Sequence, residues 1–209
     1  LHVCDKNMVR MDTNNDSKAK HDLLLDVCYA AKFEGQSIKT HYPKYQTTYG
    51  DTGHTTCTML ARSFADIGDI VRGKDLYFGK KKKKQNETER DELENKLKGV
   101  FAKIHGNLKG EAQTYYNDDT DGNYYKLRED WWDANRETVW KAITCDERLA
   151  NASYFHATCS ASGDSTSPSQ AHDKCRCPKT SGANAGKGSG DGDVNIVPTY
   201  FDYVPQYLR

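Results

Sequence analysis

Apolar residues recur at three-and-four spacing in four segments of the chain, which is the pattern of an amphipathic helix. The segments span residues 20–33, about 55–71, 87–108 and 126–144. Gly35, Gly73 and Gly110 closely follow the first three and predict where those helices end, because glycine readily adopts the left-handed conformation of a helix C-cap. Four amphipathic helices joined by polar loops predict an all-α helical bundle.

The apolar faces of these segments predict the core. Phe64 and Leu97 lie within the apolar stripes of the second and third segments. Trp132 and Trp140 lie about two turns apart on one face of the fourth. We expect these four side chains to be buried rather than to stack on a sugar or a receptor side chain. Trp131 falls off the main apolar face, so it is the tryptophan best placed to meet a ligand.

The pattern changes after Cys159. Residues 160–170 and 180–193 are rich in Ser, Gly and Asp, have no helical period and predict long irregular loops. The close of the chain, residues 198–209, is aromatic and carries Tyr200, Phe201, Tyr203 and Tyr207. We expect it to pack back on the helices or to lead into a further subdomain.

Composition says little about the partner. The 209 residues hold 30 Lys and Arg against 30 Asp and Glu, so the net charge favours no class of ligand. This balance hides two oppositely charged stretches: residues 74–109 carry 11 basic and 6 acidic residues, whereas residues 110–150 carry 5 and 10. No stretch approaches the roughly 20 apolar residues of a membrane span.

Seven cysteines accompany an apolar fraction of only 36%. A core of that size needs cross-links, and this many cysteines is typical of an oxidising, extracellular compartment. The odd number predicts a free thiol or a partner outside the sequence. Because the chain opens and ends within motifs, we expect a piece of a longer domain, in which Cys4 and one cysteine near the C-terminal end pair with residues beyond it.

A catalytic site can be drawn on paper, but disulfides explain the same residues better. Cys57 or Cys159 would need a histidine as base. The histidines considered are His54, His156 and His172. Cysteines of a secreted chain usually form bridges, and the sequence has no Gly-x-Ser-x-Gly or His-Glu-x-x-His motif. We therefore expect no enzyme.

A metal site and a phosphate loop meet similar objections. Cys159, His172, Cys175 and Cys177 are four zinc-type ligands, but their spacing is not that of a standard zinc finger. Thiolates are lost to disulfides in an oxidising compartment, so we expect no metal and no other cofactor. Gly186-Lys187-Gly188 lacks the Ser or Thr that a phosphate loop needs after its lysine and is interpreted as linker.

One local feature supports a binding function. It is the run Lys80, Lys81, Lys82, Lys83 and Lys84, which is followed by Lys96, Lys98, Lys103 and Lys109. Together these lysines predict a basic strip for a sulfated glycan, which binds through several screened charge contacts. The alternative is a solvated loop, because five carboxylates between Glu87 and Glu94 lie close enough to neutralise much of the charge. Nothing in the pattern indicates a nucleic acid beyond generic attraction.

Several motifs carry a resemblance to a known family. The longer ones lie at residues 57–77, which include Asp66-Ile-Gly-Asp-Ile70, and at 131–145 and 202–209. The shorter ones are Leu1-His-Val-Cys4, Lys20-His-Asp-Leu-Leu24, His41-Tyr-Pro-Lys-Tyr45 and Lys174-Cys-Arg-Cys177. In order and spacing they resemble the Duffy-binding-like alpha domain of the Plasmodium falciparum erythrocyte membrane protein 1 adhesins. The resemblance covers the whole chain and implies a disulfide-linked helical fold.

The resemblance also implies subdomains and a bridge. Residues 1–19 would end a first subdomain, residues 20–150 would form the helical second, and residues 151–209 would begin a loop-rich third. Cys57 would bridge to Cys145. For the loop region we expect a bridge from Cys159 to Cys177, and the partners of Cys28 and Cys175 stay open.

The function implied by the resemblance is adhesion without chemistry. Members of this family are displayed on the infected red cell as the extracellular part of a membrane-anchored protein, and take part in cytoadherence, rosetting and antigenic variation. The implied partners are a host-cell receptor or a heparan-sulfate-like glycan, the adjacent cysteine-rich interdomain region, and host antibodies. The alternative is a structural spacer that presents the interdomain region and makes no receptor contact itself.

Overall fold

The computed structural model describes residues 6–9, 18–50, 55–75, 89–116, 122–154, 156–159, 170–171, 173–177 and 197–209. Several expected features fall outside these ranges. They are the lysine run at 80–84, the loop at 180–193 and, apart from Gln170, the loop at 160–170.

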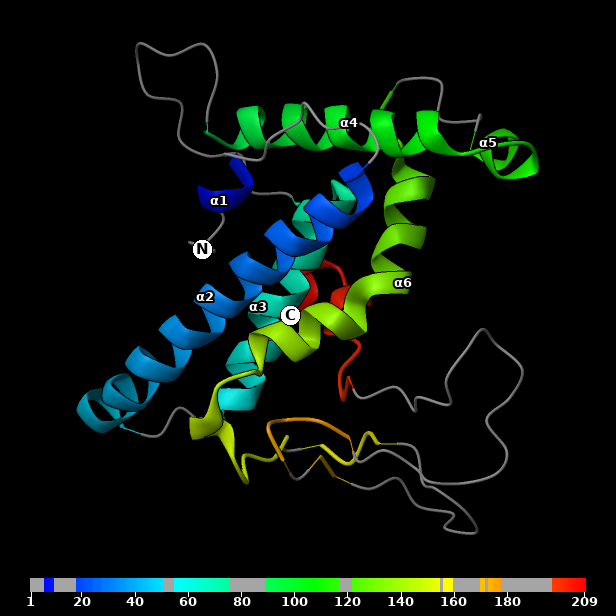
Figure 1. The fold of residues 1–209 in the computed structure, drawn as a ribbon. Coiled ribbons are helices and arrows are strands. Elements are labelled where there is room, and N and C mark those ends of the chain that lie inside the picture. The colour runs from blue at the N-terminus through cyan, green and yellow to red at the C-terminus, as the bar shows by residue number, and fades with distance from the viewer. Residues whose placement is uncertain are drawn as a thin grey trace, which may run out of the picture.

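Helices dominate the described residues (Figure 1). They are α1 (Lys6–Val9), α2 (Ala19–Tyr49), α3 (Thr56–Arg72), α4 (Glu89–Asn107), α5 (Glu111–Tyr115) and α6 (Tyr125–Ile143). Short 3₁₀ turns follow at η2 (Glu147–Leu149), η3 (Phe201–Tyr203) and η4 (Gln206–Leu208). Within the described ranges there is no strand and no helix long and apolar enough to cross a bilayer. The predicted all-α bundle is confirmed.

The ends of α3 follow from local sequence. Thr55 is the N-cap, and its Oγ1 accepts a hydrogen bond from the amide of Thr58 at 3.2 Å. Gly73 ends the helix in the left-handed conformation, with φ of 72°, and its N–H donates to the carbonyl of Ile70 at 3.1 Å. The predicted stop at Gly73 is therefore correct.

The predicted end of the first helix at Gly35 is wrong. Helix α2 continues through Gly35 and Pro43 to Tyr49. Gly35 is buried where α2 meets the end of α6, and a Cβ added there would overlap the carbonyl oxygen of Ile143. This glycine allows two helix backbones to approach closely and does not end the helix.

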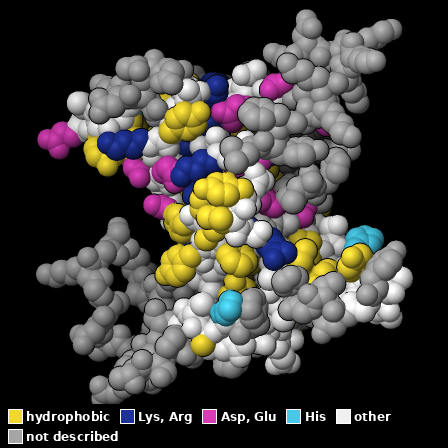
Figure 2. Space-filling model, turned by 180° about the vertical axis from the view of Figure 1, so that it is seen from behind, with side chains coloured by type: hydrophobic (Ala, Val, Ile, Leu, Met, Phe, Trp, Pro, Cys, Tyr) yellow, Lys and Arg dark blue, Asp and Glu magenta, His cyan; other side chains and the backbone are white. Residues whose placement is uncertain are grey.

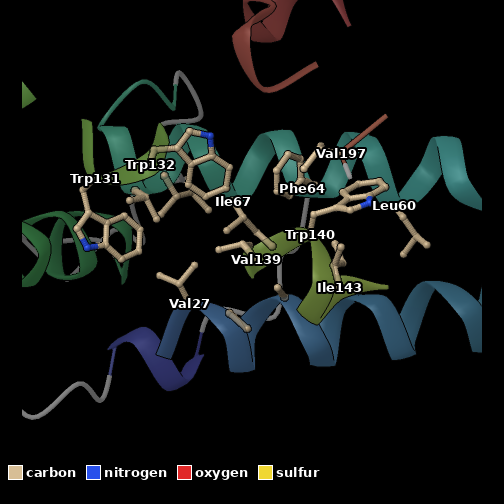
Figure 3. Packing of buried hydrophobic residues seen from close by; sticks show 14 of the residues in the cluster. Val27, Leu60, Phe64, Ile67, Trp131, Trp132, Val139, Trp140, Ile143 and Val197 are labelled. Atoms are coloured by element: carbon tan, nitrogen blue, oxygen red, sulfur yellow. The ribbon is translucent and has the colours of Figure 1, made fainter. Parts of the chain in front are cut away.

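Phe64 lies between the two indoles that the sequence assigns to the core. Its ring centroid is 5.1 Å from that of Trp132 and 5.1 Å from that of Trp140, and all three side chains are fully buried (Figure 3). Gly68 lies one turn further along α3, where an added Cβ would come within 2.8 Å of the Trp132 ring. Leu97 of α4 is buried too, so the four expected core residues are all in the core.

Trp131 corrects the sequence interpretation. Instead of facing solvent it is 4% exposed, and its ring meets that of Phe101 edge-on with centroids 6.1 Å apart. The expectation treated α6 as packed on one side only. In the structure α3 covers one side of α6 and α4 covers another, so both sides carry buried indoles (Figure 3).

The end of the chain folds back on the helices, which is one of the two expected outcomes. Residues 197–209 lie against α3 and α6, on the far side of the molecule in Figure 1. The proposed division at residues 19 and 150 stays a prediction, because close packing does not decide where a subdomain begins.

Candidate functional site

The predicted basic strip divides over α4. Lys96 and Lys103 are seven residues apart and lie about 20° apart around the helix axis. Lys98 lies about 160° from Lys96, on the opposite flank. Lys109 follows the helix end and is exposed. Of these four lysines, only Lys96 and Lys103 share one flank of the helix.

Carboxylates accompany the lysines of α4. Glu92 lies one turn before Lys96, with Oε1 3.6 Å from the lysine Nζ. Glu89 and Asp91 lie in the first turn, where negative charge is stabilised by the helix dipole. Glu94 is half-buried and accepts hydrogen bonds of 2.7 and 2.9 Å from the buried Arg128. The described part of α4 therefore has a mixed charge.

The expected bridge between Cys57 and Cys145 is wrong. Cys57 bonds to Cys175, with an S–S distance of 1.94 Å. The backbone of Cys175 is held in place from two sides: Trp140 Nε1 donates to its carbonyl at 3.1 Å, and its N–H donates to the carbonyl of Ala152 at 3.0 Å. Both sulfurs are buried at the start of α3. The expected bridge between Cys159 and Cys177 forms, with an S–S distance of 2.02 Å.

Two cysteines among the described residues are free. Cys145 is exposed just beyond the end of α6, whereas Cys28 is half-buried on α2. Arg176 occupies the end of α6, donating to Thr144 Oγ1 at 2.8 Å and to the carbonyls of Lys141 and Thr144. This cap fixes the loop that carries Cys175 over the core and leaves Cys145 outside. Burial raises the pKa of the Cys28 thiol, which makes it less reactive.

Disulfides occupy the cysteines that the metal site and the catalytic site considered in the sequence analysis would need. Three of the four zinc-type ligands, Cys159, Cys175 and Cys177, are bonded in disulfides, and His172 lies outside the described ranges. The two candidate nucleophiles, Cys57 and Cys159, are therefore both bonded in disulfides. In the described part of the chain, no group of three His, Cys, Asp or Glu residues is arranged to hold a metal ion.

Asp202 is the centre of a buried polar cluster that the sequence analysis missed. It is 1% exposed, and its carboxylate accepts from Trp132 Nε1 at 2.9 Å and from Arg136 at 2.8 and 2.9 Å. Its carbonyl accepts a hydrogen bond from Arg72. Since Arg72 belongs to α3 and Arg136 to α6, one residue ties both helices to the C-terminal segment.

Arg209 extends this cluster. Its guanidinium donates to Asp66 Oδ1 at 3.0 Å and to Asp69, which also pairs with Arg72 at 3.0 Å. Burial raises the pKa of Asp66 to about 6 and that of Asp69 in the same direction, although Arg209 opposes both shifts. The name polar joint is used below for the set Asp66, Asp69, Arg72, Arg136, Asp202 and Arg209.

The polar joint had one visible signal in the sequence. Arg136 lies on the mainly apolar face of its segment, where a buried charge needs a partner. That partner is 66 residues away, and the bond from Arg72 to Asp202 spans 130. No local pattern identifies pairs at such separations.

The comparisons with known proteins agree with the helical fold. The model of the Duffy binding domain family matches residues 1–209. No match was found among curated proteins.

Solved structures of PfEMP1 domains are similar to this chain. The NTS-DBL1α1 domain of Plasmodium falciparum membrane protein 1 (PfEMP1) from the varO strain has a TM-score of 0.68 and 38% identity over 99% of this chain and 40% of that one. The NTS-DBL1α and CIDRγ double domain of varO PfEMP1 has a TM-score of 0.69 and 38% identity over 99% and 25%. The PfEMP1 IT4var13 DBLβ domain bound to ICAM-1 has a TM-score of 0.57 and 32% identity over 69% and 34%. The chain thus spans less than half of each structure.

Proposed function

Because this chain belongs to the Duffy binding domain family, we propose that it is a host-cell adhesion module of a variant parasite surface antigen, displayed on the infected red cell. The observation that carries the proposal is the likeness to the varO DBL1α domain of PfEMP1, at 38% identity over 99% of this chain. A related DBLβ domain was solved bound to ICAM-1, so this fold presents a surface to a host protein in at least that case. Adhesion needs surface chemistry and no catalytic group.

The proposed contact is a sulfated glycan bound by the lysine run at residues 80–84 together with Lys96 and Lys103. The run precedes α4 in sequence by a few residues, and Lys96 and Lys103 share one flank of that helix. Because the described carboxylates of α4 offset its lysines, most of the net positive charge must come from residues 80–84. Lys98, on the opposite flank, is left out of the contact.

The second candidate is a structural spacer. It is favoured by the varO double-domain structure, in which a domain similar to this chain is joined to a CIDRγ domain. In that case the neighbouring region would engage the receptor, and this chain would set its position. A spacer predicts no glycan or red-cell binding by this chain.

Heparin and uninfected red cells are the probes that separate the two candidates. We expect binding that weakens as salt rises, because exposed charge contacts are screened. Replacing all five lysines of residues 80–84 by Ser is expected to weaken binding at least roughly tenfold, since each lysine near an anionic surface contributes on the order of 1 kcal/mol. A Lys96→Ser and Lys103→Ser double variant is expected to weaken it less.

Lys98→Ser is the matched control, because it removes one charge from the other flank of the same helix. It should leave heparin binding unchanged. Salt-sensitive binding that survives the five-lysine variant would move the site elsewhere on the chain. No binding to either probe would support the spacer.

A further inference from the structure

Helix α2 carries apolar side chains on two opposite sides. One side, which includes Leu23 and Val27, is buried and packs on α3 and α6; Figure 3 shows Val27 between α2 and the tryptophans of the core. The other side carries Leu25, Tyr29 and Phe33 at four-residue spacing, and these three residues are called the outer ridge. Tyr29 lies about 160° around the helix axis from Val27, so the ridge faces away from the core.

The outer ridge is exposed and partly ordered. Leu25 is 55% exposed, Tyr29 45% and Phe33 49%. The rings of Tyr29 and Phe33 stack, with centroids 6.2 Å apart and ring planes 21° apart. Rings that are already in contact lose less conformational freedom when a partner covers them. Single exposed apolar side chains are ordinary on a protein surface, whereas a continuous row of them is typical of an interface.

The pattern of α2 is that of an interior helix. A helix with apolar residues on opposite sides is stable in water only when both sides are covered by protein. In this chain, α3 and α6 cover one side, while the outer ridge stays exposed. Asp26 and Lys32 lie three residues before and after Tyr29, about 60° to either side of it. A covering segment would therefore be apolar along its middle and meet one charge of each sign at its edges.

The size of a similar structure indicates where that segment comes from. This chain aligns over 99% of its length with the varO NTS-DBL1α1 domain, at 38% identity, but accounts for only 40% of that domain's chain. A domain of this kind therefore holds more protein than this chain supplies. We propose that the outer ridge is the docking face for the remaining part of the Duffy binding domain, through an apolar segment with a basic residue facing Asp26 and an acidic residue facing Lys32.

The docking of the ridge has a consequence for adhesion. In the complete domain α2 is an interior helix, so Leu25, Tyr29 and Phe33 are closed to a host receptor. Receptor contacts must then use other surfaces of the chain. The inference concerns packing within one domain and does not rest on the proposed lysine contact, whose residues lie on and before α4.

The test uses a chimera, the varO NTS-DBL1α1 domain with its matching part replaced by this chain. Hydroxyl-radical footprinting with mass spectrometry measures how fast each exposed tyrosine is oxidised. Tyr45 is the internal control, because it is 50% exposed on the same helix and stacks with Tyr42 at 6.5 Å between centroids, but lies about 160° around the axis from Tyr29. We expect Tyr29 to be oxidised about fivefold more slowly than Tyr45, because oxidation follows exposure and a covered side chain is at most about a tenth exposed.

Equal oxidation of Tyr29 and Tyr45 in the chimera would overturn the proposal. So would protection of Tyr29 that appears only as the chimera self-associates at rising concentration, because the ridge would then bind a second copy of the domain. Both comparisons are made without altering the ridge, so they do not depend on whether a variant folds.

Substitution gives a second measurement on the same chimera. Tyr29→Gln and Phe33→Gln together should raise its unfolding equilibrium constant about tenfold or more, because two half-exposed side chains become fully buried when the ridge is covered. Tyr45→Gln should change that constant by less than about twofold, as expected for an exposed side chain. Equal effects of the two sets of substitutions would contradict docking at the ridge. All lysines are intact in these variants, so heparin binding tests the proposed glycan contact separately.

Discussion

The polar joint and the lysine flank of α4, which is formed by Lys96 and Lys103, are both rich in charge, but they differ in burial. Asp202 in the joint is 1% exposed and bonded to two side chains of α6. The side chain of Lys96 on α4 is 30% exposed and lies 3.6 Å from a carboxylate that is itself exposed. A charge inside must have partners within the protein, whereas a charge outside is available to a ligand. Residue type alone therefore does not mark a binding site.

The two regions also differ in what a substitution costs. Removing one partner of a buried ion pair costs about 3–5 kcal/mol, because the other charge is left buried and unpaired. An exposed pair contributes about 0–1 kcal/mol. Substitutions in the polar joint should therefore lower the stability of the fold much more than substitutions of Lys96 and Lys103. Heparin binding should respond in the opposite way, with the larger loss from the lysine substitutions.

The largest expected effect on stability comes from a buried feature, the disulfide between Cys57 and Cys175. This bridge joins residues 118 apart, and a chain-entropy model assigns such a loop about 5 kcal/mol of stabilisation. The double variant Cys57→Ser and Cys175→Ser should lower the free energy of urea unfolding by about that amount.

Cys145→Ser is the control for the bridge, because Cys145 is exposed and free. It should leave stability unchanged. Peptide mapping after alkylation of the folded chain should find label on Cys145 and a linked peptide pair containing Cys57 and Cys175. A linked pair containing Cys57 and Cys145, or a strongly destabilised Cys145→Ser, would contradict the observed pairing.

Asp202→Ala is the next largest change. It leaves Arg136 and the indole N–H of Trp132 buried without their acceptor, so we expect a loss of about 3–5 kcal/mol in unfolding free energy. Asp133→Ala is the control. Asp133 is exposed and accepts from the hydroxyl of Tyr203, so its loss should cost no more than about 1 kcal/mol. A similar loss of unfolding free energy in the two variants would contradict the expectation that the buried carboxylate contributes more to stability than the exposed one.

Asp66 gives the joint a pH dependence. Burial raises its pKa to about 6 from the ordinary 3.8, so between these values the folded chain holds the proton more tightly than the unfolded chain. The contribution of Asp66 to stability is therefore greatest below pH 3.8 and is lost as the pH rises through about 6. Asp66→Asn lacks this titration. From acid to neutral pH its unfolding free energy should fall less, or rise more, than that of the parent; parallel profiles would exclude the effect.

The smallest expected effect is on the lysine flank. Lys96→Ser and Lys103→Ser together should change the unfolding free energy by less than about 1 kcal/mol, because both lysines lie at the surface and the pair of Lys96 with Glu92 is largely exposed to solvent. The same double variant should still weaken heparin binding at low salt. A loss of stability comparable with that of Asp202→Ala would place these lysines among the structural charges.

The sequence predicts a structural feature well when the residues that determine it are near one another in the chain. The bounds of α3 follow from Thr55 and Gly73, which act within one turn of the chain. The burial of Phe64, Trp132 and Trp140 follows from helical period. These features need no knowledge of the rest of the fold.

The errors arise where two distant segments meet. Gly35 looks like a stop but lies at a crossing with Ile143, and Trp131 looks exposed until α4 covers it. The family resemblance implies a bridge from Cys57 to Cys145, whereas the loop that carries Cys175 docks beside Cys57 and supplies its partner. Of the proposed binding residues, the sequence identifies the lysines, and the helix predicted over residues 87–108 already separates Lys98 from Lys96 by about 160°.

The aromatic residues at the end of the sequence are more exposed than their residue types suggest. Tyr200, Tyr203, Tyr207 and Leu208 are 60%, 45%, 75% and 66% exposed. Figure 2, which views the molecule from behind, shows hydrophobic side chains gathered in the middle of this face with charged ones beside them. The packing of this segment thus involves its polar residue Asp202 together with Tyr203, whose ring centroid lies 5.6 Å from the guanidinium of Arg72 and 5.1 Å from that of Arg136.

The long reach of Asp202 has a consequence for the order of folding. Helices α3 and α6 form from local contacts, but the bonds of Asp202 close loops of 66 and 130 residues, and such loops form late because their closure entropy precedes any gain. Until then, packing α3 fully against α6 would bury Arg136 without the acceptors that Thr199 and Asp202 provide. During synthesis, the helices therefore stay loosely associated until residues 197–209 have been made and can dock between α3 and α6.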